Sequence, residues 1–206
     1  MQIMQKLSEE TYNKLYVTSD THFGHNKEFV YKERGYNNTV EMNDDMINII
    51  NSTVGSDGIL LHLGDFCLNT TQEGYHDILR RLKVKEIWML WGNHNNPIQR
   101  SYGGTREQIC ASNYGIFIRY LNYYYTFRKG SKEFVCCHFP LKTWDSQSNG
   151  SMHLHGHCHN NLLSSRQDDK THKILDVGWD AFNRPLHITE IVDIMSTKNI
   201  NSDIMI

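Results

Sequence analysis

Short apolar runs alternate with polar motifs along most of the chain. Five of these runs stop at a glycine or at a small polar residue, and they cover residues 15–18, 59–63, 87–91, 134–137 and 152–155. Apolar runs of this length that end at a turn signal are typical of buried strands. We therefore predict five buried strands, each of which ends directly before a polar motif.

Between the first three predicted strands, apolar side chains recur instead at the spacing of a helix. Residues 39–54 repeat apolar side chains at the period of a helix, with Thr39 or Asn43 as its N-cap. Residues 73–82 show a second pattern of this kind, and residues 106–112 predict a short helix. The first half of the chain therefore has the βαβαβ order that is typical of a parallel sheet.

Runs of β-branched and aromatic residues dominate the second half. Besides the strands at 134–137 and 152–155, they cover residues 116–118, 120–127, 173–177 and 186–192. Turn signals such as Gly130 separate several of these runs, which predicts a mostly antiparallel second half. Two packed sheets with helices outside would bury both halves, so we predict an α/β fold.

The composition limits the classes of protein to which the chain can belong. The 206 residues are 39% hydrophobic and 21% charged, and the formal net charge of −2 gives no general field for nucleic acid or acidic membranes. No apolar run resembles a secretion signal or spans a bilayer. The five cysteines form no C-x-x-C pair, which favours reduced thiols. We expect one domain over 1–195, a flexible tail over 196–206 and a cytoplasmic location.

Each predicted strand is followed by side chains that bind divalent metals. The motifs, in chain order, are Asp20-Thr21-His22, Gly64-Asp65, Gly92-Asn93-His94, His138 and Gly156-His157-Cys158-His159. Taken singly, each motif also fits a turn or a structural histidine. Their succession, always after an apolar run, is not readily produced by chance. Since ligands gather at the carboxyl ends of strands in α/β sheets, the motifs predict one metal site.

The residue types suit two adjacent metals. Asp20 and His22 are two apart on an extended segment and can chelate one metal, to which His159 returns. Asp65 has two carboxylate oxygens and is the best candidate for a bridge between the metals. The second metal would then take three further ligands: Asn93, His138 and His157. His94 would stand beside the metals and protonate the leaving oxygen or steady the transition state.

In this order the motifs resemble those of the calcineurin-like metallophosphoesterases: D-x-H, G-D, G-N-H-D/E, a later H, and G-H-x-H. The resemblance runs from residue 15 to about residue 190. Residues 19–25 and 176–180 are similar to a compact subgroup found in bacteria and their phages. The resemblance implies a four-layer α/β/β/α sandwich of two mixed sheets flanked by helices. It also implies the two ligand sets given above, with His94 as the catalytic residue.

One position departs from the family pattern. Asn95 stands where the family usually has an acidic residue after the catalytic histidine. An amide accepts a hydrogen bond but does not stabilise an imidazolium by charge. Five residues near the motifs are candidates for contacts with the ligands or the substrate: His25, Arg34, His62, Asn95 and His155. For the three histidines among them a structural role is the alternative.

The segment 26–34 follows the first motif and is both basic and aromatic. It suits contact with a phosphate or stacking on a base, and a solvated loop is the alternative. The chemistry expected is hydrolysis of a phosphodiester (a cyclic nucleotide, a nucleotide or a nucleic-acid end) by metal-activated hydroxide. The two metal ions would be Mn, Fe, Zn, Co or Ni.

Three alternatives stay open at this stage. A phosphomonoesterase acting on a small metabolite or a nucleotide is the nearest one. A catalytically weak binding scaffold is another, but the complete ligand set argues against it. A nuclease within a larger complex is disfavoured by the acidic charge balance. We expect a phosphate-ester substrate, no membrane partner and no stable nucleic-acid complex, with the oligomeric state open.

Overall fold

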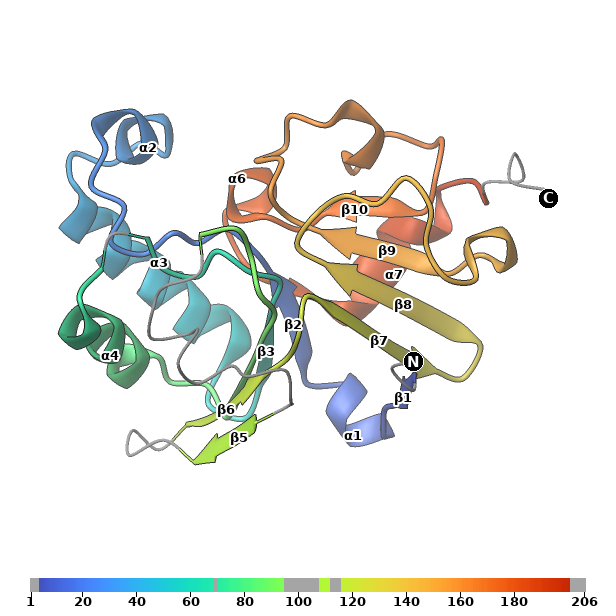
Figure 1. Ribbon diagram of the computed structural model, residues 1–206, viewed down its shortest axis with the longest axis horizontal. Coiled ribbons are helices and arrows are strands. Elements are labelled where there is room, and N and C mark those ends of the chain that lie inside the picture. The colour runs from blue at the N-terminus through green and yellow to red at the C-terminus, as the bar shows by residue number, and fades with distance from the viewer. Residues whose placement is uncertain (1–3, 69, 95–107, 112–115, 201–206) are drawn as a thin grey trace.

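The computed structural model describes residues 4–68, 70–94 and 116–200, together with the backbone of residues 108–111 (Figure 1). It contains two mixed β-sheets flanked by helices, as predicted. The six-stranded sheet has the order β11-β2-β3-β4-β6-β5. Its strands are β2 (Leu15–Thr18), β3 (Ile59–His62), β4 (Glu86–Met89), β5 (Gln108–Ala111), β6 (Phe117–Tyr120) and β11 (Leu186–His187).

The six-stranded sheet is parallel at its centre. β2, β3, β4 and β6 pair in parallel, whereas β5 and β11 pair antiparallel at the two edges. Two helices follow β2 and one follows β3: α2 (Glu28–Glu33), α3 (Thr39–Val54) and α4 (Gln72–Arg81). In Figure 1 these three helices lie together on one side of this sheet. The βαβαβ order predicted for the first half is thus confirmed.

The second sheet has five strands in the order β1-β7-β8-β9-β10. These are β1 (Gln5–Lys6), β7 (Tyr124–Lys129), β8 (Lys132–Cys137), β9 (Met152–His155) and β10 (Ile174–Asp176). The remaining short elements are α1 (Glu9–Tyr12), η1 (Gln147–Asn149), η2 (Leu163–Ser165), α6 (Trp179–Phe182) and α7 (Ile188–Ser196). Only β7 and β8 pair antiparallel in this sheet.

The prediction of a mostly antiparallel second half is therefore wrong. Gly130 does close a tight hairpin between β7 and β8. However, long segments connect β8 to β9 and β9 to β10, and connections of that length allow the chain to cross over and pair in parallel. The runs were identified correctly, but the lengths of the connections between them decide the strand direction.

Three local predictions also need correction. Residues 108–111 form an edge strand rather than a helix, because their backbone pairs with β6. The run 186–192 is a strand only over Leu186–His187, after which α7 buries Ile188 and Ile191 at helical spacing. The cap of α3 is Asn38, whose side chain accepts a hydrogen bond from the Glu41 N–H.

Two apolar cores hold the layers together. The first lies between the two sheets, and α7 packs against it. Its largest buried side chains include Trp88, Phe127 and Phe134. The second core lies between the six-stranded sheet and helices α3 and α4. It includes Met46 and Tyr75 from these helices. The strands of the six-stranded sheet are therefore covered on both faces where they lead into the polar motifs.

The end of the described chain is anchored. α7 runs to Ser196, and Lys198 is buried and donates hydrogen bonds from Nζ to the carbonyl oxygens of Arg166 and Asp169, both at 2.6 Å. Residues 201–206 of the expected tail lie outside the described residues. The division into a domain over 1–195 and a tail stays a prediction. No helix among the described residues is long and apolar enough to cross a membrane.

His153 is a buried structural histidine. Its Nδ1 lies 2.9 Å from the Val135 carbonyl oxygen, and its Nε2 accepts a hydrogen bond from the Leu141 N–H at 3.0 Å. Both ring nitrogens are thus used by the backbone, which makes the neutral imidazole the required form. Burial lowers the pKa of His153 to about 3.

Acidification is therefore expected to destabilise the protein through His153. Its folded pKa lies below the unfolded value of about 6.5. The unfolded chain thus takes up a proton first, and the stabilisation present above pH 6.5 is lost as the pH falls towards 3. His153→Gln, which can replace both hydrogen bonds, should show a smaller fall in the free energy of unfolding between pH 7 and pH 5. Equal falls in wild type and variant, measured by urea unfolding, would contradict this assignment.

Candidate functional site

The motifs meet where the carboxyl ends of the strands of both sheets lie close together. β2 and β3 pair in parallel register, and the pairing continues beyond them: the Asp20 N–H donates to the Gly64 carbonyl at 3.1 Å, and the His22 N–H to the Asp65 carbonyl at 3.0 Å. The five-stranded sheet adds its own motifs in the same way, since the Gly156 N–H donates to the His138 carbonyl at 3.0 Å. Motifs far apart in sequence are thus placed side by side by sheet register.

The motif backbones adopt an unusual conformation. Positive φ angles, between 48° and 68°, occur at six non-glycine residues of the site: Asp20, His22, Asp65, His157, His159 and Asn160. Such residues cost about 1–3 kcal/mol each and persist only where the surroundings enforce them, which is typical of functional sites. All six are Asp, His or Asn, the non-glycine types most often found in the left-handed region, but the sequence pattern does not indicate which of them adopt it.

Two glycines allow the carboxylates to approach the neighbouring loops. A Cβ on Gly92 would lie 2.0 Å from Oδ1 of Asp65, and one on Gly156 would lie 2.1 Å from Oδ2 of Asp20. Any side chain at either position would displace a carboxylate. The glycines of the G-N-H and G-H-x-H motifs are therefore needed for the shape of the site.

The first group of predicted ligands contains Asp20, His22 and His159. Nε2 of His22 lies 3.7 Å from Oδ1 of Asp20, and Nε2 of His159 lies 4.0 Å from the same oxygen. The three ligand atoms lie within 4.8 Å of one another, which is close enough for one cation. Asp65 joins this group, since its Oδ2 is 3.7 Å from Nε2 of His22.

The second group is centred on His138. Its Nε2 lies 3.4 Å from Oδ2 of Asp65 and 2.8 Å from Oδ1 of Asn93. That amide oxygen is also 2.9 Å from Nδ1 of His157. Oδ2 of Asp65 therefore faces both groups, which is the geometry expected of a bridging ligand. All seven predicted metal ligands are brought together.

The buried polar atoms of the site suit divalent cations. Asp20 is fully buried, and among the described residues its Oδ1 has no hydrogen-bond partner; burial raises the pKa of its carboxyl to about 6. Burial also lowers the pKa of His22 to about 3, so this imidazole is neutral and offers a lone pair. A buried carboxylate needs a counter-charge, and mixed oxygen and nitrogen donors suit borderline divalent metals. The residues therefore fit a pair of such ions.

Hydrogen bonds set the charge states of the other two central ligands. Burial opposes the charged form of Asp65, but the contact with His138 and its neighbours outweighs this and lowers the pKa of the carboxyl to about 2. Burial likewise opposes protonation of His138, while Asp65 and Asp20 more than offset it and raise the pKa of His138. The Asp65 carboxylate is thus ionised at neutral pH.

Arg34 and Asp180 form a clamp beside the first group. The buried Arg34 guanidinium donates from Nε and Nη2 to the two carboxylate oxygens of Asp180, at 2.7 and 2.9 Å. It also donates to the carbonyls of Thr21 and Asp20, both at 2.8 Å. Oδ2 of Asp180 in turn lies 2.5 Å from Nδ1 of His159. Burial disfavours the charge on Asp180, but these two partners hold its pKa well below the usual range.

These contacts bear on two residues. Arg34, a candidate for contact with the ligands or the substrate, has its guanidinium committed to Asp180 and to the backbone of the first motif, so its contacts are with the ligand groups. Asp180, which was not among the predicted site residues, contacts the predicted ligand His159. The available signal was its place in the segment 176–180 that is similar to the compact subgroup.

The weaker candidates fall at different distances from the ligand groups. His62 is fully buried; its Nε2 is 3.0 Å from the Thr21 hydroxyl, and its Nδ1 accepts from the Gly64 N–H at 3.3 Å. His62 therefore supports two motifs without entering the site. His155 is also buried, with Nδ1 2.7 Å from the Gly156 carbonyl. Asn95 lies outside the described residues.

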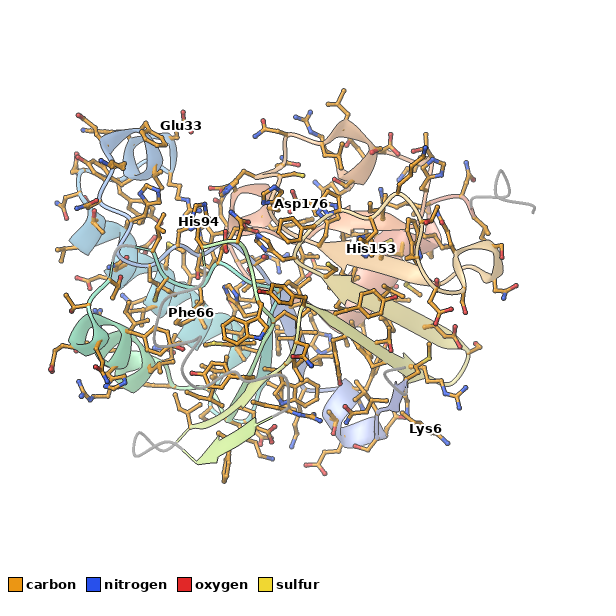
Figure 2. All side chains as sticks on the ribbon, in the orientation of Figure 1. Lys6, Glu33, Phe66, His94, His153 and Asp176 are labelled. Atoms are coloured by element: carbon orange, nitrogen blue, oxygen red, sulfur yellow. The ribbon has the colours of Figure 1, made fainter. Side chains whose placement is uncertain are left out.

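A cleft of about 650 Å³ opens over the ligand groups. His94 lines it, and the His94 N–H donates to Oδ1 of Asp65 at 2.8 Å. The side chain is exposed, and its ring lies 5.7 Å from that of His22. Figure 2 shows His94 between the two halves of the fold, with Glu33 on one half and Asp176 on the other. The volume is within the range of small-molecule sites.

Comparison with known proteins agrees with this geometry. The calcineurin-like phosphoesterase family matches residues 14–196. The chain is 26% identical over 184 residues to MJ1445, an uncharacterised protein of Methanocaldococcus jannaschii, covering 88% of this chain and 91% of that protein.

Two solved structures are also similar. AQ665, a protein of unknown function from Aquifex aeolicus, has a TM-score of 0.61 and 16% identity, over 87% of this chain and 98% of that chain. The phosphoesterase YfcE from E. coli has a TM-score of 0.40 and 15% identity, over 80% of this chain and 77% of its own. AQ665 supports the fold, while the family match covers every motif described above. The chain therefore belongs to the calcineurin-like phosphoesterase family and is a metal-dependent phosphoester hydrolase.

Proposed function

We propose that this hydrolase cleaves a phosphodiester at a site holding two divalent ions. One observation carries the proposal: Oδ2 of Asp65 lies 3.7 Å from Nε2 of His22 and 3.4 Å from Nε2 of His138, so one carboxylate serves both ligand groups. The first ion would be held by Asp20, His22, Asp65 and His159. The second would be held by Asp65, Asn93, His138 and His157. Mn, Fe, Zn, Co and Ni all suit these donors.

The chain's own residues would orient the reaction. When bound, the two ions supply Lewis acidity to phosphoryl oxygens and lower the pKa of a water molecule. Asp65 fixes the backbone of His94 through the hydrogen bond from the His94 N–H. The exposed imidazole of His94 would then face the leaving oxygen and donate a proton to it. Asp180 would hold His159 in the orientation that presents Nε2 to the first ion.

A diester is favoured over a monoester by the shape of the cleft. A diester carries two substituents on phosphorus, and the cleft extends from the ligand groups both to α2 and to α6. Phe29 lines the α2 side and Asn183 the α6 side. Each side thus has room for one substituent.

Two further proposals concern the cellular compartment of the enzyme and its interaction with nucleic acid. Cys67, Cys136, Cys137 and Cys158 are free thiols, which supports a reducing compartment such as the cytoplasm. The absence of a strong net charge supports a substrate that is released rather than a stable nucleic-acid complex.

Hydrolysis of two chromogenic esters tests the proposed reaction. Metal-free protein should cleave neither bis-p-nitrophenyl phosphate nor p-nitrophenyl phosphate, and adding Mn²⁺, Ni²⁺ or Zn²⁺ should restore cleavage with preference for the diester. His94→Ala should retain the metals and lose roughly 10²–10⁴-fold in kcat, the usual contribution of general acid catalysis. Preference for the monoester would reject the diesterase assignment, and metal binding without turnover of either ester would favour a scaffold.

A further inference from the structure

The α2 wall of the cleft carries an exposed aromatic ring. Phe29 lines the cleft, and 64% of its surface is exposed. The ring of His25 meets it edge-on, with centroids 6.0 Å apart, and the ring of His25 in turn lies 5.9 Å from that of His22. Two ring contacts therefore lead from a predicted metal ligand to Phe29.

The position of Phe29 is fixed relative to the ligand groups. α2 is too short to be stable alone. Val30 and Tyr31 attach it to the second apolar core, and Arg34 at its C-cap joins it to the first motif through the carbonyls of Asp20 and Thr21. Phe29 takes no part in these attachments and faces the cleft instead.

Exposed amide groups line the same cleft from the other half of the fold. Asn183 follows α6, and Asn161 lies just after the G-H-x-H motif; both are exposed. Amide side chains both donate and accept hydrogen bonds, as the edge of a nucleobase does. The cleft therefore combines a flat apolar wall with groups that suit the polar edge of an aromatic heterocycle.

We propose that Phe29, with His25 behind it, forms a stacking subsite for the base of a nucleoside phosphate ester. The inference rests on the proposed phosphodiesterase function and names its substrate class. An isolated exposed phenylalanine needs no explanation by itself. Phe29 differs from Phe117, which is 53% exposed on β6, because Phe29 lines the cleft that contains His94 and the ligand groups. Every base offers a π-face, so the subsite would accept several nucleosides.

Equilibrium binding to the Mn²⁺-loaded protein tests the subsite without relying on turnover. Titration calorimetry should show that thymidine 5′-phosphate binds roughly 5- to 100-fold more tightly than methyl phosphate, the usual range for one stacked base. Phe29→Ala and Phe29→Leu should bring this ratio close to one. Phe29→Trp, which keeps a flat ring, should preserve it. Phe117→Ala, a matched loss of an exposed ring elsewhere, should preserve it as well.

The outcomes distinguish a failure of the subsite proposal from a failure of the proposed function. Equal binding of the two ligands by wild type, or equal loss of preference in Phe29→Ala and Phe117→Ala, would overturn the subsite. Preference for thymidine 5′-phosphate without metal-dependent hydrolysis of any ester would keep the subsite and reject the diesterase. Because Phe29 is mostly exposed, its variants should melt close to wild type, and Phe29→Trp guards against misfolding.

Discussion

Asp65→Asn is expected to lower kcat/KM for the diester by roughly 10²–10³-fold, a loss typical of removing an electrostatic group from an active site. Asparagine keeps the size of the side chain and can still accept the hydrogen bond from the His94 N–H. It removes the negative charge that faces both His22 and His138. The metal content, measured by inductively coupled plasma mass spectrometry, should fall below two ions per chain.

Asp57→Asn provides the matched control for this substitution. Asp57 is exposed and pairs with Lys14 at 2.7 Å, away from the cleft. Exposed ion pairs contribute less than about 1 kcal/mol, so this variant should keep wild-type activity and metal content. If Asp65→Asn retained two tightly bound ions and normal turnover, Asp65 would not bridge the two groups.

Loss of the clamp is expected to destabilise the fold more than any single surface change. Arg34→Ala would leave Asp180 without its buried partner and remove the donors to the Asp20 and Thr21 carbonyls. Breaking a buried ion pair by removing one partner costs about 3–5 kcal/mol. In a protein of this size we expect a fall in Tm of roughly 10 °C. Thermal unfolding of the metal-free protein measures it.

A second readout separates this role from general stability. Asp180 holds His159, and losing such a contact to a metal ligand typically costs 10–100-fold in metal affinity. Below its melting temperature, Arg34→Ala should therefore bind Mn²⁺ more weakly. The control is Arg81→Ala, which removes an exposed pair with Asp44 and should change the free energy of unfolding by less than about 1 kcal/mol. Equal Tm values for the two variants would show that the clamp contributes nothing.

The predicted ligands lie together because each follows the end of a strand, and the pairing of the strands sets which motifs are neighbours. Asp20 and Asp65 follow parallel strands in register, so reading the apolar runs sufficed to place them side by side. His138 and His157 follow β8 and β9 for the same reason, even though the direction of that pairing was predicted wrongly. β8 and β9 lie inside the five-stranded sheet, and an antiparallel pairing would have placed His138 and His157 at opposite ends of it, so their meeting depends on the parallel pairing that the sequence did not predict.

Other features of the site depend on contacts that no local pattern encodes. Arg34 and Asp180 are 146 residues apart, so no local sequence pattern indicates that they pair. The helix predicted over 106–112 failed over 108–111 because pairing with β6 overrides local propensity. The left-handed backbone at Asp20 and Asp65 is tolerated by aspartate, but residue type alone does not indicate which aspartates adopt it.

Anomalous diffraction from crystals grown with Mn²⁺ tests the two-ion site most directly. The geometry predicts two anomalous peaks about 3.5–4 Å apart. One should lie beside Asp20, His22 and His159 and the other beside Asn93, His138 and His157, with the Asp65 carboxylate between them. A single peak, or two peaks without Asp65 as a shared ligand, would contradict the account.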